Sequence, residues 1–317
     1  MDLEIVNAKE FIESKPEEKE MAIKGLLERG SLGFLFGQPK IGKSLLAFNL
    51  ALEASKGGIF LDTFPIPKPL RTLLLIGEGS RRSHWNRLRK IAGSKGIQND
   101  NLKLLFNRRL KLDQRPDVNQ LIAVIKEHHI DFLIVDPLFR YFIGDEKEGA
   151  DMAKLINNIG LVQEKGVTVV IVHHVVKDTQ GKSPGQRLRG HGSLHAAGET
   201  YIMIERLDGS RKTISIEFDY KDGEIESMKA KRNDDTLTFY AEGLNRAGIP
   251  DMVHILKENG GRMEQQQLIS LSMNRFGIRS DKTVREILGH AKEIGVIDSR
   301  PLPGKGGPLE LFITGGG

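Results

Sequence analysis

Short apolar runs alternate with stretches of helical periodicity over the first two thirds of the chain. The expected strands are 32–36, 72–76, 103–106, 132–135 and 167–172, and the expected helices are 43–55, 81–92, 117–128 and 150–165. The strands are almost continuously apolar, which is typical of a parallel sheet that helices cover on both faces. We therefore predict an α/β fold with a mostly parallel sheet.

The pattern changes after Gly198 to a succession of strands and turns. Further strands are expected at 201–205, 213–220, 224–230 and 237–240, with Asp-Gly turns at 208–209 and 222–223. Asp-Gly between apolar runs is a strong hairpin signal, so these strands should extend the sheet in an antiparallel manner. The sheet domain is predicted to span residues 30–246.

Two smaller segments flank the predicted sheet domain. Residues 1–29 indicate an N-terminal helical segment of one or two amphipathic helices, interrupted at Pro16. Residues 247–317 contain the remaining elements, namely helices at 251–258, 264–273 and 282–294 and strands at 296–300 and 309–313. This order of elements resembles a winged helix-turn-helix domain.

A glycine-rich loop lies between the first strand and the first helix of the sheet domain. It fits the P-loop pattern G-x-x-x-x-G-K-[ST], and its predicted nucleotide contacts are Gly37, Gln38, Pro39, Lys40, Ile41, Gly42, Lys43, Ser44 and Leu45. Backbone N–H groups in such a loop close around phosphate oxygens at the positive end of the helix dipole. We expect Lys43 to reach the β- and γ-phosphates of ATP and the Ser44 hydroxyl to bind Mg²⁺.

Two carboxylates end other predicted strands. Phe132 to Asp136 is a run of four apolar residues and an aspartate, the Walker B pattern, so Asp136 should hold the Mg²⁺ shell from a neighbouring strand. Glu78 follows the strand 72–76. A carboxylate at that place is able to orient and deprotonate the water that attacks the γ-phosphate.

A later strand ends in His173 and His174, and all these motifs together resemble the RecA-like hexameric helicases of the RepA and DnaB types. The resemblance covers residues 31–240, and the P-loop is its specific part. It implies that Glu78 is the catalytic base and that a histidine senses the γ-phosphate. Adjacent strand residues face opposite ways, so only one histidine can do this, and the spacing in the family favours His174.

The resemblance also implies a contact between subunits. In RecA-like rings a Lys/Arg pair reaches the γ-phosphate of the next subunit. Lys229, Lys231 and Arg232 are the candidates here, and Arg232 is favoured as the finger. We expect this strand to lie too far from its own P-loop to serve it, although a solvated turn would also explain the cluster.

A second stretch resembles the loops that line the central channel of such rings. Residues 177–192 contain four glycines, one proline and four basic residues against one acid. Lys182, Arg187 and Arg189 are therefore expected to contact the phosphates of single-stranded DNA. The alternative is a flexible surface loop without a ligand.

Positive charge is concentrated between Lys68 and Arg115, where 13 Lys and Arg residues stand against three acids, whereas the whole chain carries only +5. The predicted helix 81–92 holds five of these cations. Trp85 and Leu88, together with Ile91, are expected to form its buried stripe and to leave the basic side chains in solvent. Contact of the basic face with phosphate groups or with a neighbouring subunit is the alternative.

Composition narrows the class of protein. The 317 residues include no cysteine, which excludes disulfide scaffolds and Cys-ligated zinc sites and suits a reducing compartment. Hydrophobic residues make up 39% and charged residues 28% of the chain, as in globular proteins. The apolar runs are too short to span a membrane, and the acidic start lacks a signal pattern, so we expect a cytoplasmic protein without a membrane partner.

These observations predict a Mg-ATP-hydrolysing RecA-like motor on single-stranded DNA. The favoured class is a RepA-type replicative DNA helicase that forms a homo-hexameric ring. Its winged helix is expected either to bind nucleic acid or to dock a protein such as a replication-initiation partner. The alternative is a RecA-family DNA-binding ATPase without unwinding activity, such as a recombination mediator or plasmid-maintenance regulator. A third hypothesis is a winged-helix DNA-binding regulator that only senses nucleotide, but a sensor has no need of the base Glu78.

Overall fold

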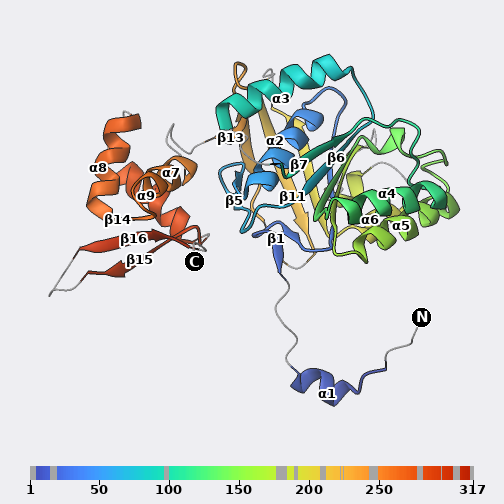
Figure 1. The fold of residues 1–317 in the computed structure, drawn as a ribbon, viewed down its shortest axis with the longest axis horizontal. Coiled ribbons are helices and arrows are strands. Elements are labelled where there is room, and N and C mark those ends of the chain that lie inside the picture. Colours follow the sequence, from blue (N-terminus) through green and yellow to red (C-terminus); the bar gives the residue numbers. More distant parts are fainter. Residues whose placement is uncertain are drawn as a thin grey trace.

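The computed structural model describes residues 5–14, 20–95, 100–175, 184–188, 192–207, 212–221, 223, 225–242, 249–276, 281–293, 295–302 and 308–314. A nine-stranded sheet dominates these residues, in the order β13-β12-β11-β10-β3-β9-β8-β6-β7 (Figure 1). Its strands are β3 (Leu32–Gly37), β6 (Thr72–Ile76), β7 (Leu102–Leu105), β8 (Phe132–Asp136), β9 (Thr168–His174), β10 (Thr200–Arg206), β11 (Thr213–Tyr220), β12 (Met228–Arg232) and β13 (Phe239–Ala241).

The strands from β10 to β7 run parallel, and β11, β12 and β13 continue the sheet in an antiparallel manner. Both parts agree with the pattern of the sequence, and the prediction of an α/β fold with a mostly parallel sheet is confirmed. Among the described helices, none is long and apolar enough to cross a membrane.

Helices cover both faces of the sheet. One face carries α2 (Lys43–Lys56) and α3 (Arg81–Lys95), and the other carries α4 (Arg115–Glu127), α5 (Gly149–Gln163) and α6 (Gly192–Ala197) (Figure 1). Alternate residues of each inner strand enter opposite cores. In β8, Phe132 and Ile134 pack under α2, whereas Leu133 and Val135 pack under α4 and α5. Burial on both faces explains why these strands are continuously apolar.

The N-terminal segment differs from its prediction. Only α1 (Ala8–Glu13) is helical among its described residues, and it buries no side chain. The expected helix over 21–27 is wrong, because β1 (Met21–Ile23) and β2 (Leu27–Glu28) form an antiparallel hairpin. Gly25 in the turn has a φ of 69°, which a helix does not allow, and Leu26 and Leu27 are fully buried against the sheet. A second short hairpin, β4 (Ile59–Phe60) and β5 (Phe64–Pro65), was not expected from the sequence.

The last part of the chain has a core of its own. Its elements are α7 (Ile249–Glu258), β14 (Arg262–Glu264), α8 (Gln265–Phe276), α9 (Asp281–Glu293), β15 (Ile297–Pro301) and β16 (Leu309–Ile313). The three strands form an antiparallel sheet in the order β14-β16-β15. Met252, Leu268 and Leu311 are among the side chains buried there. β14 is not among the predicted strands, because three residues with only Met263 buried are too few to form an alternating pattern.

We expect Gly37→Ala to destabilise the protein. A Cβ at this position would clash with the backbone carbonyl oxygen of Ile204 on the paired strand β10, and neither strand can move without loss of ladder hydrogen bonds. Overpacking of this kind costs about 1–3 kcal/mol of unfolding free energy. Urea unfolding followed by circular dichroism measures the effect.

Gly160→Ala is the matched control, because nothing lies within 4 Å of the added methyl group in α5. It should leave stability unchanged or raise it by about 0.5–1 kcal/mol through helix propensity. Equal unfolding midpoints for the two variants would contradict the close approach of β3 and β10.

Candidate active site

The P-loop joins β3 to α2 at the carboxyl edge of the parallel strands. Lys40 and Gly42 adopt left-handed conformations, with φ of 62° and 111°. Gly42 is the N-cap of α2 and makes no side-chain cap hydrogen bond. The first N–H groups of α2 are thus left for a ligand at the positive end of the helix dipole, which is an arrangement suited to phosphate.

The Lys43 side chain is buried inside this loop. Its Nζ donates hydrogen bonds to the carbonyl oxygens of Gly37 and Gln38, each at 2.8 Å. Burial lowers the pKa of Lys43 to about 8, against the opposing effect of Asp136 and Glu78. A phosphate group beside this ammonium would restore the charge compensation that water provides elsewhere.

Ser44 and Asp136 lie side by side, as the two motifs predict for metal ligands. The Ser44 hydroxyl donates to Asp136 Oδ1 at 3.0 Å. Burial raises the pKa of Asp136 to about 6, while the Ser44 hydrogen bond and Lys43 oppose the shift. A buried carboxylate of this kind is stabilised by a cation, and a hydroxyl with a carboxylate is the donor set that Mg²⁺ takes beside nucleotide phosphates. The described residues hold no cluster of three or more His, Asp or Glu that could bind a metal unaided. Mg²⁺ in nucleotide sites is held by one or two protein groups together with water and phosphate oxygens.

Glu78 lies just beyond the carboxyl end of β6 and, unlike Lys43 and Asp136, is half exposed. Its Oε1 accepts two hydrogen bonds from Arg140, from Nε at 3.2 Å and from Nη2 at 3.0 Å. Arg140 belongs to the short helix η1 (Leu138–Arg140), which follows Asp136 closely. Ion pairs this exposed contribute at most about 1 kcal/mol, so Glu78 is able to exchange Arg140 for water at little cost. Arg140 is not among the predicted site residues, and its place four residues after the Walker B aspartate is the only sequence signal for it.

The backbone of the Glu78 loop is fixed more firmly than its side chain. The buried ring of His84 lies with Nε2 at 2.5 Å from the Glu78 carbonyl oxygen, and Arg108 Nη2 donates to the Gly79 carbonyl at 2.6 Å. Gly79 has a φ of 80°, and a Cβ there would press on the His84 ring. A carbonyl only accepts, so Nε2 of His84 carries the proton. Burial lowers the pKa of His84, which favours this neutral form.

The burial of His84 corrects the predicted orientation of α3. Trp85 was expected in the buried stripe, but its side chain is 58% exposed, and His84 takes the buried place with Leu88 and Ile91. The reason is a slot between Phe48 and the residues after β7. His84 lies there with ring centroids 5.6 Å from Phe48 and 5.9 Å from Phe106. Leu88 and Ile91 face the core as expected, so the difference is confined to the first position of the stripe, where His84 replaces Trp85.

The two histidines at the end of β9 face opposite ways. His174 is half buried, and its Nδ1 lies 3.2 Å from Lys43 Nζ. His173 is fully buried. His174 therefore lies beside the group expected to hold the terminal phosphates, and its ring is also 5.9 Å from that of Phe139 in η1.

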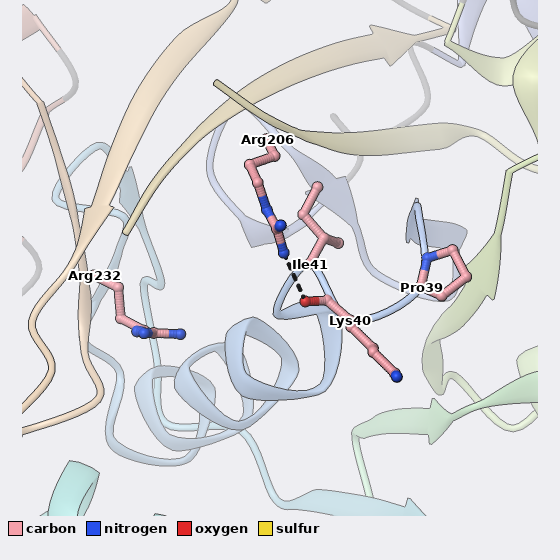
Figure 2. Close-up of a pocket in the computed structure, with 5 residues that line it drawn as sticks. All are labelled: Pro39, Lys40, Ile41, Arg206 and Arg232. Carbon is pink, nitrogen blue, oxygen red and sulfur yellow. Dashed lines mark hydrogen bonds between the residues drawn. The ribbon is translucent and has the colours of Figure 1, made fainter. Parts of the chain in front are cut away.

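Arg232 lies in a place that the sequence analysis did not expect. It lines a hollow of about 460 Å³ together with Pro39, Lys40, Ile41 and Arg206 (Figure 2). Arg206, at the end of β10, donates to the Lys40 carbonyl oxygen at 3.2 Å, and Arg232 pairs with Asp234 at 2.7 Å. The end of β12 thus lies nearer to its own P-loop than expected, because Arg232 and three residues of that loop line the same hollow.

The predicted nucleic-acid contacts fall mostly outside the described residues. This applies to Lys182 and Arg189. Arg187 ends the short helix η2 (Gly185–Arg187), and its Nη1 lies 3.5 Å from Glu217 and 3.8 Å from Glu205. Its guanidinium is directed at β10 and β11, so it is already paired within the fold.

Residues 3–180, more than half of the chain, match the profile of a family described as an AAA domain. The matched stretch contains the P-loop, Glu78, Asp136 and His174. No curated protein matches the chain. With Lys43, Ser44 and Asp136 assembled around the loop as described, the chain belongs to this AAA domain family of P-loop ATPases.

Proposed function

We propose that the protein is a RecA-like motor that couples ATP hydrolysis to action on single-stranded DNA, of the RepA-type replicative helicase class. The observation that carries the proposal is the convergence of four groups at the carboxyl ends of adjacent parallel strands. These groups are Lys43, Asp136, Glu78 and His174. A base and a candidate phosphate sensor beside a P-loop favour hydrolysis over mere nucleotide sensing.

In this mechanism the P-loop N–H groups and Lys43 hold the phosphates. Ser44 and Asp136 hold Mg²⁺, which when bound neutralises charge on the phosphate oxygens. Glu78 exchanges its hydrogen bonds from Arg140 for a water molecule and takes its proton during in-line attack. His84 keeps the Glu78 loop in place, and His174 detects whether the γ-phosphate is present beside Lys43.

The ring and the trans-acting finger belong to the same proposal. Arg232 stands at the outer face of the P-loop, and among the described residues its ion pair is with the exposed Asp234, so it is able to turn towards a phosphate. Its closeness to Lys40 of the same chain makes a role within one subunit the direct alternative to a role across the interface. In the proposed homo-hexamer, Arg232 acts across the interface between subunits.

The C-terminal unit supports a winged-helix domain. Its helices and three-stranded antiparallel sheet follow the order expected of that fold, with β15 and β16 as the wing. On α9, the helix that would read DNA, Arg285 pairs with Asp281 and Lys282 with Glu286. This internal compensation favours a docked protein, such as a replication-initiation partner, over a DNA duplex.

Strand displacement distinguishes the two leading hypotheses. A forked DNA substrate should be unwound in the presence of Mg-ATP if the protein is a helicase. A recombination mediator or plasmid-maintenance regulator of the RecA family would hydrolyse ATP faster with single-stranded DNA and leave the fork intact. The absence of cysteine suits the reducing cytoplasm, where either protein would work.

Lys43→Ala and Glu78→Gln should fail at different steps. The first removes the cation at the phosphates and should weaken nucleotide binding by about 10- to 100-fold, as loss of a hydrogen bond to a charged group does. The second removes the base alone and should lower turnover by about 10²- to 10⁴-fold with binding retained. Equilibrium binding of a fluorescent ATP analogue and steady-state phosphate release measure the two effects.

Glu127→Gln, at an exposed position on α4, is the matched control for the lost carboxylate and should change neither quantity. Hydrolysis by Glu78→Gln at the rate of the unchanged protein would place the base elsewhere.

Mixing of subunits tests whether Arg232 acts in trans. Loss of an arginine finger costs about 10³- to 10⁵-fold in turnover, so Arg232→Ala and Lys43→Ala should each be inactive alone. In mixed rings some interfaces combine an intact P-loop with an intact Arg232, and part of the ATPase activity should return. No recovery indicates that Arg232 serves its own P-loop, and full activity of Arg232→Ala alone indicates a solvated side chain.

The salt dependence of single-stranded DNA binding tests the 177–192 loop. Each phosphate contact on a single strand contributes about 0.7 to the slope of log affinity against log salt. Lys182→Gln with Arg189→Gln should therefore lower the slope by about 1.4. Arg187→Gln should change it little, because Arg187 pairs with Glu205 and Glu217. An unchanged slope in the double variant would exclude the loop as the DNA contact.

A further inference from the structure

One face of α3 presents the single tryptophan of the chain among cations. The side chain of Trp85 is 58% exposed, and the guanidinium of Arg89 lies over its ring at 5.1 Å from the centroid. Arg82 and Arg89 are exposed three residues before and four residues after Trp85, so the three side chains share one helix face. We call Arg82, Trp85 and Arg89 the α3 face.

The charge of this surface is uncompensated. No acidic residue occurs in α3, and Arg81 and Lys90 extend the exposed cations at the borders of the face. Within the described part of the chain, none of the exposed Arg and Lys side chains of 81–90 forms an ion pair. A face of this kind attracts an anionic partner.

The neighbours of Trp85 in α3 explain why its side chain is exposed to solvent. The inner side is filled by His84, which holds the Glu78 loop, and by Leu88 against the core. Trp85 makes no ring contact other than that with Arg89 among the described residues. A large planar ring, backed by a guanidinium and bordered by cations, is a stacking platform for a nucleobase.

We propose that the α3 face binds a segment of single-stranded nucleic acid, with one base stacked on Trp85 and the adjoining phosphates on Arg82 and Arg89. The inference rests on the proposed function in that single-stranded DNA is the partner. It adds a contact separate from the 177–192 loop, because α3 follows β6 whereas that loop follows β9, and β8 lies between these strands.

The chemistry of the face favours nucleic acid over other anionic partners. A docked protein buries apolar surface around an aromatic anchor, but the nearest exposed neighbours of Trp85 on the face are Arg82 and Arg89. A membrane surface takes up the apolar side of a helix, and here Leu88 and Ile91 turn that side to the core. Single-stranded nucleic acid fits both features of the α3 face, because a base stacks on Trp85 and phosphates contact Arg82 and Arg89.

Trp85 provides its own readout. Titration of the full-length protein with oligo(dT) should quench the intrinsic fluorescence in a saturable manner, because no other tryptophan contributes. Binding is measured in parallel by the anisotropy of a labelled oligo(dT). Trp85→Ala should weaken it by roughly 5- to 100-fold, the effect of one lost stacked base, and Trp85→Phe should retain most of the affinity.

Arg82→Gln with Arg89→Gln should lower the slope of log affinity against log salt by about 1.4. Lys126→Gln with Lys165→Gln is the matched control, since it removes two exposed cations from the opposite face of the sheet. The control should bind like the unchanged protein. Both double variants should keep the ATPase rate measured without DNA, which shows that they are folded.

Four results would overturn the inference. Binding of oligo(dT) without a change in Trp85 fluorescence, or with equal slopes in the two double variants, excludes the α3 face and leaves single-stranded DNA as partner. Fluorescence changes with protein concentration or with phosphatidylserine vesicles, and none with oligo(dT), assign the face to a second copy or to a membrane. No binding of oligo(dT) by any assay rejects the proposed function as well.

Discussion

Two opposite charges, Lys43 and Asp136, are buried at one edge of the sheet, and the site depends on how they are kept charged. Burial moves their pKa values towards each other, to about 8 and about 6. The loop carbonyls compensate Lys43 and the Ser44 hydroxyl compensates Asp136, each in part. A buried charge is costly unless it is paired, so a ligand that brings phosphate oxygens to one and a cation to the other relieves both costs together. This is the physical reason why the edge is suited to a metal-bound nucleotide.

The parallel arrangement of the sheet makes this pairing possible. β3 lies between β9 and β10, so the P-loop is contacted from both sides, by His174 at Lys43 and by Arg206 at the Lys40 carbonyl. The approach of β10 is so close that a Cβ at position 37 would clash with the Ile204 carbonyl oxygen. The loop is therefore held in its left-handed conformation by the neighbouring strands as well as by its own glycines, and it is preorganised for an anion.

Sequence reasoning succeeded where the signal is local and failed where partners come from elsewhere in the chain. The P-loop and the Walker B strand have spacing that a short window contains, and continuous apolar runs indicate strands buried on both faces. The hairpin at 21–28 failed because its apolar residues permit a helix, and only the φ of Gly25 and the burial of Leu26 against the sheet exclude it. His84 displaced Trp85 from the core because Phe48 and Phe106 form a slot that no pattern within α3 reveals. Arg140 was missed for the same reason, since its partner Glu78 is 62 residues away.

Glu78 is more exposed than Lys43 and Asp136, and this difference in exposure fits the different roles proposed for them. Groups that bind charged ligands act more strongly when they are shielded from water, and Lys43 and Asp136 are both buried. A general base must accept a hydrogen bond from water and then a proton, so a deeply buried and strongly paired carboxylate would be a poor one. The structure resolves this conflict by separating backbone from side chain: His84 and Arg108 fix the loop through its carbonyl oxygens, and the Glu78 carboxylate ends in an exposed pair that is easily exchanged. Since Arg140 follows Asp136 in the chain, the group that occupies Glu78 is tied to the strand that carries the proposed metal ligand.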